Sequence, residues 1–205
     1  MVSSTLEEHS DEDLLDRYKA GDEQAFEVLL RRYRTKVFNF LLRSVRDPSR
    51  AEDLLQEVFL RVVHRCEHFE RRAKFSTWLY TIARNLCVDA SRKMIHRRHR
   101  SLDAPARSDL DGSEALVERV PSGAPQTDRD AIAQQLRGQI AAAIEELPSD
   151  QREVFLMRQL QGLAFKDIAT VIGVPENTVK SRMRYALERL QHALSEYDDY
   201  ARKLS

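Results

Sequence analysis

The sequence predicts an all-α protein made of two small helical domains joined by a flexible linker. Apolar residues recur with a helical period of about 3.6, and no window alternates apolar and polar residues as a strand would. One internal stretch instead loses periodicity and collects Ser, Asp, Gly and Pro. A length of 205 residues suits two small domains. We therefore expect helical domains at residues 10–100 and 128–197, with a flexible acidic linker over 101–127.

The composition excludes several classes of protein. The longest apolar runs, such as Val154–Met157, fall far short of the roughly 20 residues that span a membrane. The polar, acidic N-terminus does not resemble a secretory signal peptide. Two cysteines, Cys66 and Cys87, are too few for a disulfide framework. These features predict a cytoplasmic protein without membrane insertion.

The net charge is zero, but the charges are segregated along the chain. Residues 1–27 carry nine acidic side chains against two basic ones, and residues 65–100 carry ten Arg or Lys against three acids. Such alternation predicts a basic face for nucleic acid and acidic segments that limit indiscriminate binding. Ordinary charge segregation on a solvated surface is the alternative.

The first predicted helix begins with a capping-box-like pair, Ser10 and Asp13. Gly21 ends it, and Asp22 opens the next helix. That second helix is broadly apolar, so we expect it to form the core through Phe26, Leu29, Leu30, Tyr33, Val37, Phe40 and Leu41.

The third predicted helix begins near Ser49, with Glu52 as its capping partner. Its inward stripe comprises Ala51, Leu54, Leu55, Val58, Phe59, Val62 and Val63. A second face carries Asp53, Gln56, Glu57 and Leu60 at positions i, i+3, i+4 and i+7. A leucine among acids and an amide, outside the buried stripe, favours docking against a partner helix. A solvated face with one stray leucine is equally common.

The fourth predicted helix opens at Ser76 and continues beyond Arg92. Its inward residues are expected to be Leu79, Ile82, Ala83, Leu86, Cys87 and Ala90. Its outward residues are expected to be Thr77, Tyr80, Thr81, Arg84, Asn85, Val88 and Arg92, with Trp78 at the border. Aromatic, hydroxyl, amide and arginine groups together are typical of surfaces that hold unstacked bases and phosphates. Basic segments at 64–74 and 92–100 flank the helix. Trp78 as plain core is the alternative.

Residues 165–190 predict a helix-turn-helix. A short first helix is followed by Gly173, which suits a left-handed turn, and by Pro175, which suits the first turn of the next helix. The second helix should bury Val179, Met183, Ala186, Leu187 and Leu190, and should expose Lys180, Ser181, Arg184, Tyr185 and His192. Arginine and lysine reach guanine acceptors, while Thr178 and Ser181 can hold phosphates or bases. An ordinary helical hairpin with a charged outer face is the alternative.

These motifs carry a family resemblance. The segments AEDLLQEVF (51–59) and FSTWLYTIARN (75–85) resemble regions 2.2 to 2.4 of bacterial sigma-70 family factors. Four later segments resemble region 4 of the same family: LP (147–148), REVF (152–155), DIA (167–169) and TVKSR (178–182). Because region 1.1 and a helical region 3 are lacking, the chain is similar to the compact extracytoplasmic-function (ECF) class.

The resemblance implies a promoter-specificity subunit of RNA polymerase. The first domain would bind the β′ clamp helices through Asp53, Gln56, Glu57 and Leu60, and its Ser76 helix with the preceding loop would open the promoter −10 element. The second domain would recognise the −35 element through Lys180, Ser181, Arg184 and Tyr185. The β flap and an anti-sigma factor are the further partners that the resemblance implies.

Two other readings of the sequence compete with this one. A conventional helix-turn-helix regulator with an N-terminal partner-binding domain would need a ligand pocket or receiver fold in the first domain. An enzyme or metal site would use His64, Cys66 and His68, but their i, i+2, i+4 spacing separates neighbouring ligands and a fourth ligand is lacking. No glycine-rich phosphate loop or nucleophile motif is present. We therefore expect no catalysis, metal or cofactor, while a redox role of Cys66 or Cys87 stays open.

Overall fold

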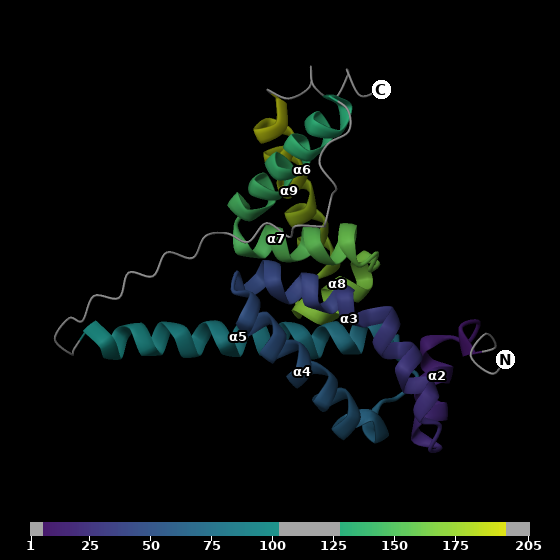
Figure 1. Cartoon of the computed structure of the whole chain (residues 1–205). Coiled ribbons are helices and arrows are strands. Elements are labelled where there is room, and N and C mark those ends of the chain that lie inside the picture. Colours follow the sequence, from purple (N-terminus) through teal and green to yellow (C-terminus); the bar gives the residue numbers. More distant parts are fainter. Residues whose placement is uncertain (1–5, 103–127, 196–205) are drawn as a thin grey trace. The chain divides into compact units, whose positions relative to one another are not determined.

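The computed structural model describes residues 6–102 and 128–195, with side chains described for 6–94 and 134–195, and these residues form helices without any strand (Figure 1). This confirms the predicted all-α class. The first part of the chain contains α2 (Asp11–Lys19), α3 (Glu23–Val45), α4 (Pro48–Arg65), the 3-10 turn η1 (Cys66–His68) and α5 (Phe75–Leu102). The second contains α6 (Asp128–Glu146), α7 (Ser149–Phe155), the π-helical turn η2 (Leu156–Leu160), α8 (Phe165–Ile172) and α9 (Glu176–Leu194).

The chain divides into two compact units, the first built on α2 to α5 and the second on α6, α7 and α9, with the short helix α8 grouped with the first. Residues 101 and 102 of the predicted linker are the last two residues of α5. The remaining residues of the linker, 103–127, lie outside the described part of the chain.

Local sequence signals set most helix ends. Ser10 caps α2, since its hydroxyl accepts a hydrogen bond from the Asp13 amide at 3.1 Å. Gly21 follows α2 with φ at 98°, as expected of a helix-ending glycine. The predicted start of α4 near Ser49 is correct to within one residue, but the predicted capping pair of Ser49 and Glu52 is wrong. Asp47 is the N-cap and Pro48 the first helical residue, because a proline tolerates the position where an amide would lack a partner.

The core of the first unit lies where α3 packs against α2, α4 and α5. Aromatic contacts reinforce it: the Tyr18 and Phe26 rings stack at 4.7 Å between centroids, and Phe40 meets Tyr80 edge to face at 5.5 Å. The most deeply buried large side chains of this unit are Leu14, Leu15, Leu29, Val37, Phe40, Leu41, Phe75, Leu79 and Tyr80.

The second unit packs α9 against α6 and α7. Val179, Met183, Ala186 and Leu190 are buried along α9, as predicted. Leu187 was expected among them, but it is 44% exposed, because successive helical residues turn by about 100° and Leu187 lies past the edge of that stripe. None of the described helices is long and apolar enough to cross a membrane.

Candidate nucleic-acid interface

The beginning of α5 buries two residues that were expected to face outward. Tyr80 is 1% exposed and Thr77 is 4% exposed, so the outward orientation predicted for both is wrong. The cause is that α5 packs against α2, α3 and α4, which buries an arc wider than a single stripe. Burial also raises the pKa of the Tyr80 hydroxyl.

The outer face of α5 is therefore narrower than the sequence predicted. Asn85 and Arg92 are exposed and Arg84 is half-buried. Trp78 is also half-buried, and its ring lies 5.2 Å from that of Phe69, so it belongs neither to the plain core nor to the free surface. Trp78, Asn85 and Arg92 are spaced by seven residues, which places them along one side of the helix.

The basic loop before α5, residues 66–74, is anchored at one end and open at its tip. Phe69 is buried, and its ring packs against Phe75 and Trp78 at 6.4 and 5.2 Å between centroids. The Arg72 side chain is 92% exposed, and its Nε lies 3.6 Å from a carboxylate oxygen of Glu70 in the same loop. Arg71 instead pairs with two carboxylates of α2, Asp13 and Asp16. The Ser10 hydroxyl and the Arg71 guanidinium hold the pKa of Asp13 below its usual range.

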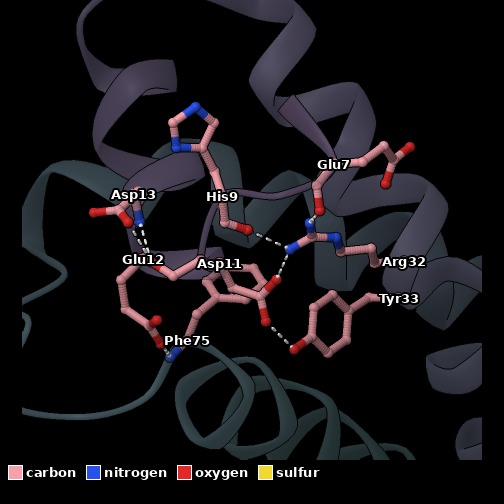
Figure 2. A network of polar contacts seen from close by, with 9 residues as sticks. Glu7, His9, Asp11, Glu12, Asp13, Arg32, Tyr33 and Phe75 are labelled. Atoms are coloured by element: carbon pink, nitrogen blue, oxygen red, sulfur yellow. Dashed lines mark hydrogen bonds and ion pairs between the residues drawn. The ribbon is translucent and has the colours of Figure 1, made fainter. Parts of the chain in front are cut away.

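A network of polar contacts joins α2 and the segment before it to α3 and α5 (Figure 2). Arg32 on α3 donates to the Asp11 carboxylate at 2.6 Å and to the His9 carbonyl at 3.0 Å. Tyr33 donates its hydroxyl to Asp11, and burial together with this contact raises the Tyr33 pKa. The Glu12 carboxylate accepts the backbone N–H of Phe75 at 2.7 Å. None of these contacts was predicted from the sequence, although the charge asymmetry between segments 1–27 and 65–100 was a signal for them.

The predicted partner-binding face of α4 lies on the surface. Asp53 and Gln56 are exposed, and Leu60 is 54% exposed, more than any other large apolar side chain among the described residues. Glu57 is partly covered and pairs with Arg61 at 2.9 Å. Leu60 is thus a single exposed leucine that shares its face of α4 with an exposed carboxylate and an exposed amide.

The turn between α8 and α9 has the geometry that the sequence predicted. Gly173 has φ at 76°, and its amide donates to the Ala169 carbonyl at 2.8 Å, which ends α8. Pro175 then stands at the N-cap of α9 with φ at −59°. Such a tight connection is typical of helix-turn-helix motifs.

The predicted contact residues of α9 occupy two faces. Lys180 and Arg184 are exposed and adjacent along the helix, and each pairs with a neighbouring glutamate: Lys180 with Glu176 at 2.7 Å and Arg184 with Glu188 at 3.9 Å. Ser181 is half-buried, and its hydroxyl donates to the Thr178 carbonyl of its own helix at 3.0 Å.

Tyr185 faces differently. It is 45% exposed and lines a hollow of the second unit between α6, α7 and α9, together with Ala143, Leu147, Gln151, Arg189 and His192. Its ring also lies 4.7 Å from the Arg184 guanidinium carbon. Lys180 and Arg184 thus form one surface of α9, and Tyr185 lies beside this surface, at the edge of the hollow.

The cysteine and histidine residues form no metal centre in the part of the chain that the structure describes. Cys66 and Cys87 are both buried free thiols. The Cys66 thiol donates to the Val63 carbonyl at 3.1 Å, within its own helical segment.

Comparison with known families matches both units. The sigma-70 region 2 model matches residues 29–98, and the sigma-70 region 4 model matches residues 137–190. Among solved structures, the sigma factor RpoE of Bartonella quintana, in complex with the anti-sigma factor NepR, has the same fold. Its TM-score is 0.61 at 24% identity, over 83% of this chain and 96% of that chain. CnrH, solved with the cytosolic domain of CnrY, gives a TM-score of 0.62 at 19% identity, covering 93% and 99%.

Curated relatives agree over nearly the full length. The RNA polymerase sigma-H factor of Pseudomonas aeruginosa is 31% identical over 92% of this chain and 96% of its own length. The ECF RNA polymerase sigma-E factor of Escherichia coli is 31% identical over 91% and 95%. The chain belongs to the ECF class of the sigma-70 family. It is accordingly a promoter-specificity subunit of RNA polymerase, and its family consists of transcription regulators.

Proposed function

We propose that the two units divide the work of promoter selection. The α4 face of Asp53, Gln56, Glu57 and Leu60 binds the polymerase core at the β′ clamp helices. The 66–74 loop and the outer face of α5, with Trp78, Arg84, Asn85 and Arg92, capture the −10 element. The surface of α9 with Thr178, Lys180, Ser181 and Arg184 recognises the −35 element, with Tyr185 on its flank, and the second unit also contacts the β flap.

One observation supports this proposal above the others. The exposed cations and amide of the first unit lie on a helix next to a basic loop, while the exposed cations of the second unit lie on the second helix of a helix-turn-helix. Two separate surfaces of this kind suit two separate DNA elements. Catalysis then belongs to the polymerase, and the protein acts in the cytoplasm without a cofactor.

Sequencing the DNA selected by reconstituted holoenzyme tests the proposal. The DNA library is randomised upstream of a fixed start site. From this library, core polymerase with this protein should enrich two motifs separated by about two turns of duplex. The protein alone should select far less. Strong selection of a single motif by the free protein would instead support the conventional helix-turn-helix regulator.

We further propose that an anti-sigma factor sequesters the free protein. The structurally similar RpoE of Bartonella quintana was solved with such a factor, NepR. Co-purification of the full chain with the product of an adjacent anti-sigma gene, and release of core polymerase by that product, would support this. Undiminished holoenzyme formation at saturating amounts of it would contradict the pairing.

Replacing Arg184 with alanine is expected to weaken promoter binding by about 1–3 kcal/mol if its guanidinium contacts a base. Sequence preference should relax at one position of the upstream element, because the lost contact is specific. Arg189→Ala is the matched control, since Arg189 lies on the same helix but lines the hollow beside α6 and α7. Selection from the randomised library by each holoenzyme variant measures the effect. An equal loss for all sequences, with a flatter salt dependence, would make Arg184 a phosphate contact instead.

A further inference from the structure

Helix α2 holds the 66–74 loop at three points. The Lys19 ammonium donates to the Phe69 carbonyl at 3.1 Å. The Arg71 guanidinium pairs with Asp13, and its Nε lies 3.1 Å from an Asp16 carboxylate oxygen. The Glu12 carboxylate accepts the Phe75 N–H at 2.7 Å, directly after the loop. These four α2 residues, Glu12, Asp13, Asp16 and Lys19, are called the α2 brace below.

The spacing of the α2 brace explains how one short helix reaches the whole loop. Glu12, Asp16 and Lys19 are separated by four and three residues, so they share one face of α2, with Asp13 beside them. The N-terminal end of α2 is also fixed by a residue outside the brace, because Asp11 binds Arg32 and Tyr33 of α3. The brace is therefore tied to the core and can set the position of the loop.

The Glu12 contact acts on α5 itself. The first amides of a helix have no partner within it, and a carboxylate near them is favourable. Phe75 is the first residue of α5, and Glu12 satisfies its amide from another helix (Figure 2). The contact fixes the residue at which α5 begins. It thereby also fixes the position of Trp78, whose ring contacts both Phe69 and Phe75.

We propose that the α2 brace consists of positioning residues for −10 recognition, and that Arg71 is a structural anchor of the loop held by Asp13 and Asp16. This inference rests on the proposed function of the loop. Within the loop, the Arg72 guanidinium is exposed and pairs with Glu70 of the same loop at 3.6 Å, while Arg71 is engaged by α2. Neutralising the brace changes the shape of the loop and not merely the charge of the surface.

The test compares full-length variants by two measurements. The first is hydrogen exchange of the backbone amides of residues 66–75, and the second is selection of DNA by holoenzyme from a library randomised over both promoter elements. The variants are Glu12→Ala, Glu12→Gln, Asp13→Ala with Asp16→Ala, and Arg71→Ala. Glu8→Gln with Glu27→Gln is the control, because it removes two exposed acidic charges from the preceding turn and from α3.

Glu12→Ala and the Asp13/Asp16 pair should each raise loop exchange by about 3–10-fold, as expected for the loss of a hydrogen bond. They should lower discrimination at the −10 element by a similar factor, with unchanged −35 preference and core affinity. Glu12→Gln should behave as wild type, because its amide oxygen still accepts the Phe75 N–H. Arg71→Ala added to the Asp13/Asp16 pair should have no further effect, because the pair already removes both carboxylates that hold Arg71. The pair also removes the Asp16–Lys19 ion pair at 3.5 Å, so Arg71→Ala alone isolates the Arg71 contacts.

Unchanged loop exchange in the Asp13/Asp16 pair, or altered exchange with an unchanged −10 profile, would overturn the proposal. So would an Arg71→Ala variant that loses affinity for all sequences alike with a flatter salt dependence, since that marks a phosphate contact. Failure of the wild-type holoenzyme to select any −10 motif would instead overturn the proposed function. Hydrogen exchange would still decide whether α2 holds the loop.

Discussion

Replacing Tyr80 with alanine is expected to lower the free energy of unfolding of the first unit by about 3–5 kcal/mol. The side chain is 1% exposed, and its ring meets Phe40 edge to face, so truncation leaves a cavity between α3 and α5. Thermal and denaturant unfolding followed by circular dichroism would measure the loss. Promoter opening should fail only because the unit unfolds.

Asn85→Ala provides the comparison on the same helix. Asn85 is exposed, so its truncation should change stability by less than about 0.5 kcal/mol while weakening −10 capture. The two variants should therefore have opposite profiles. A Tyr80→Ala protein that melts like wild type but cannot open a promoter would restore Tyr80 as a DNA contact.

Replacing Leu60 with aspartate is expected to weaken binding to core polymerase by about 1.5–3 kcal/mol, the value of burying a leucine at a partner helix. The side chain is 54% exposed in the free protein, so the fold should be unaffected. Affinity for core polymerase, measured without DNA, reports the effect alongside the melting curve.

Met94→Asp is the matched control for Leu60→Asp. Met94 is also an exposed apolar side chain of the first unit, at 41%, but it lies on α5. Its sulfur contacts Arg50 near the start of α4, ten residues before Leu60. Core affinity should be unchanged by this substitution. Equal losses for both variants, or no loss for Leu60→Asp with a normal melting curve, would contradict the assignment of the α4 face.

The helices and the turn were predictable because their determinants are local. Ser10, Gly21 and Gly173 act within a few residues of the helix ends that they set, and the structure places each as the sequence predicted. The exposure of Leu60 was also predictable, because a leucine outside a complete apolar stripe has no remaining inward position. Asp47 was missed as the cap of α4 because Ser49 and Glu52 also fit a capping pattern, and Pro48 decided between them.

The orientation of α5 was not predictable to the same degree. Periodicity describes a helix packed on one side, whereas α5 is covered by three other helices. Thr77 and Tyr80 carry polar groups, which predicted that their side chains would face solvent, but helix packing buries both. The α2 brace was beyond local reasoning altogether. Its residues are ordinary acidic and basic side chains, and their partners at Phe69, Arg71 and Phe75 are 50 to 63 residues away.

That separation has a consequence for synthesis on the ribosome. Helix α2 has nine residues, and isolated helices shorter than about 12–15 residues are marginal in water. At roughly 5–20 residues per second, the loop is made several seconds after α2, so the nascent chain spends that time with these acids unpaired. The start of α5 is therefore completed late, by the part of the protein that was made first. A truncation or fusion at the N-terminus should consequently change the position of the 66–74 loop and the start of α5, which we propose to contact the promoter.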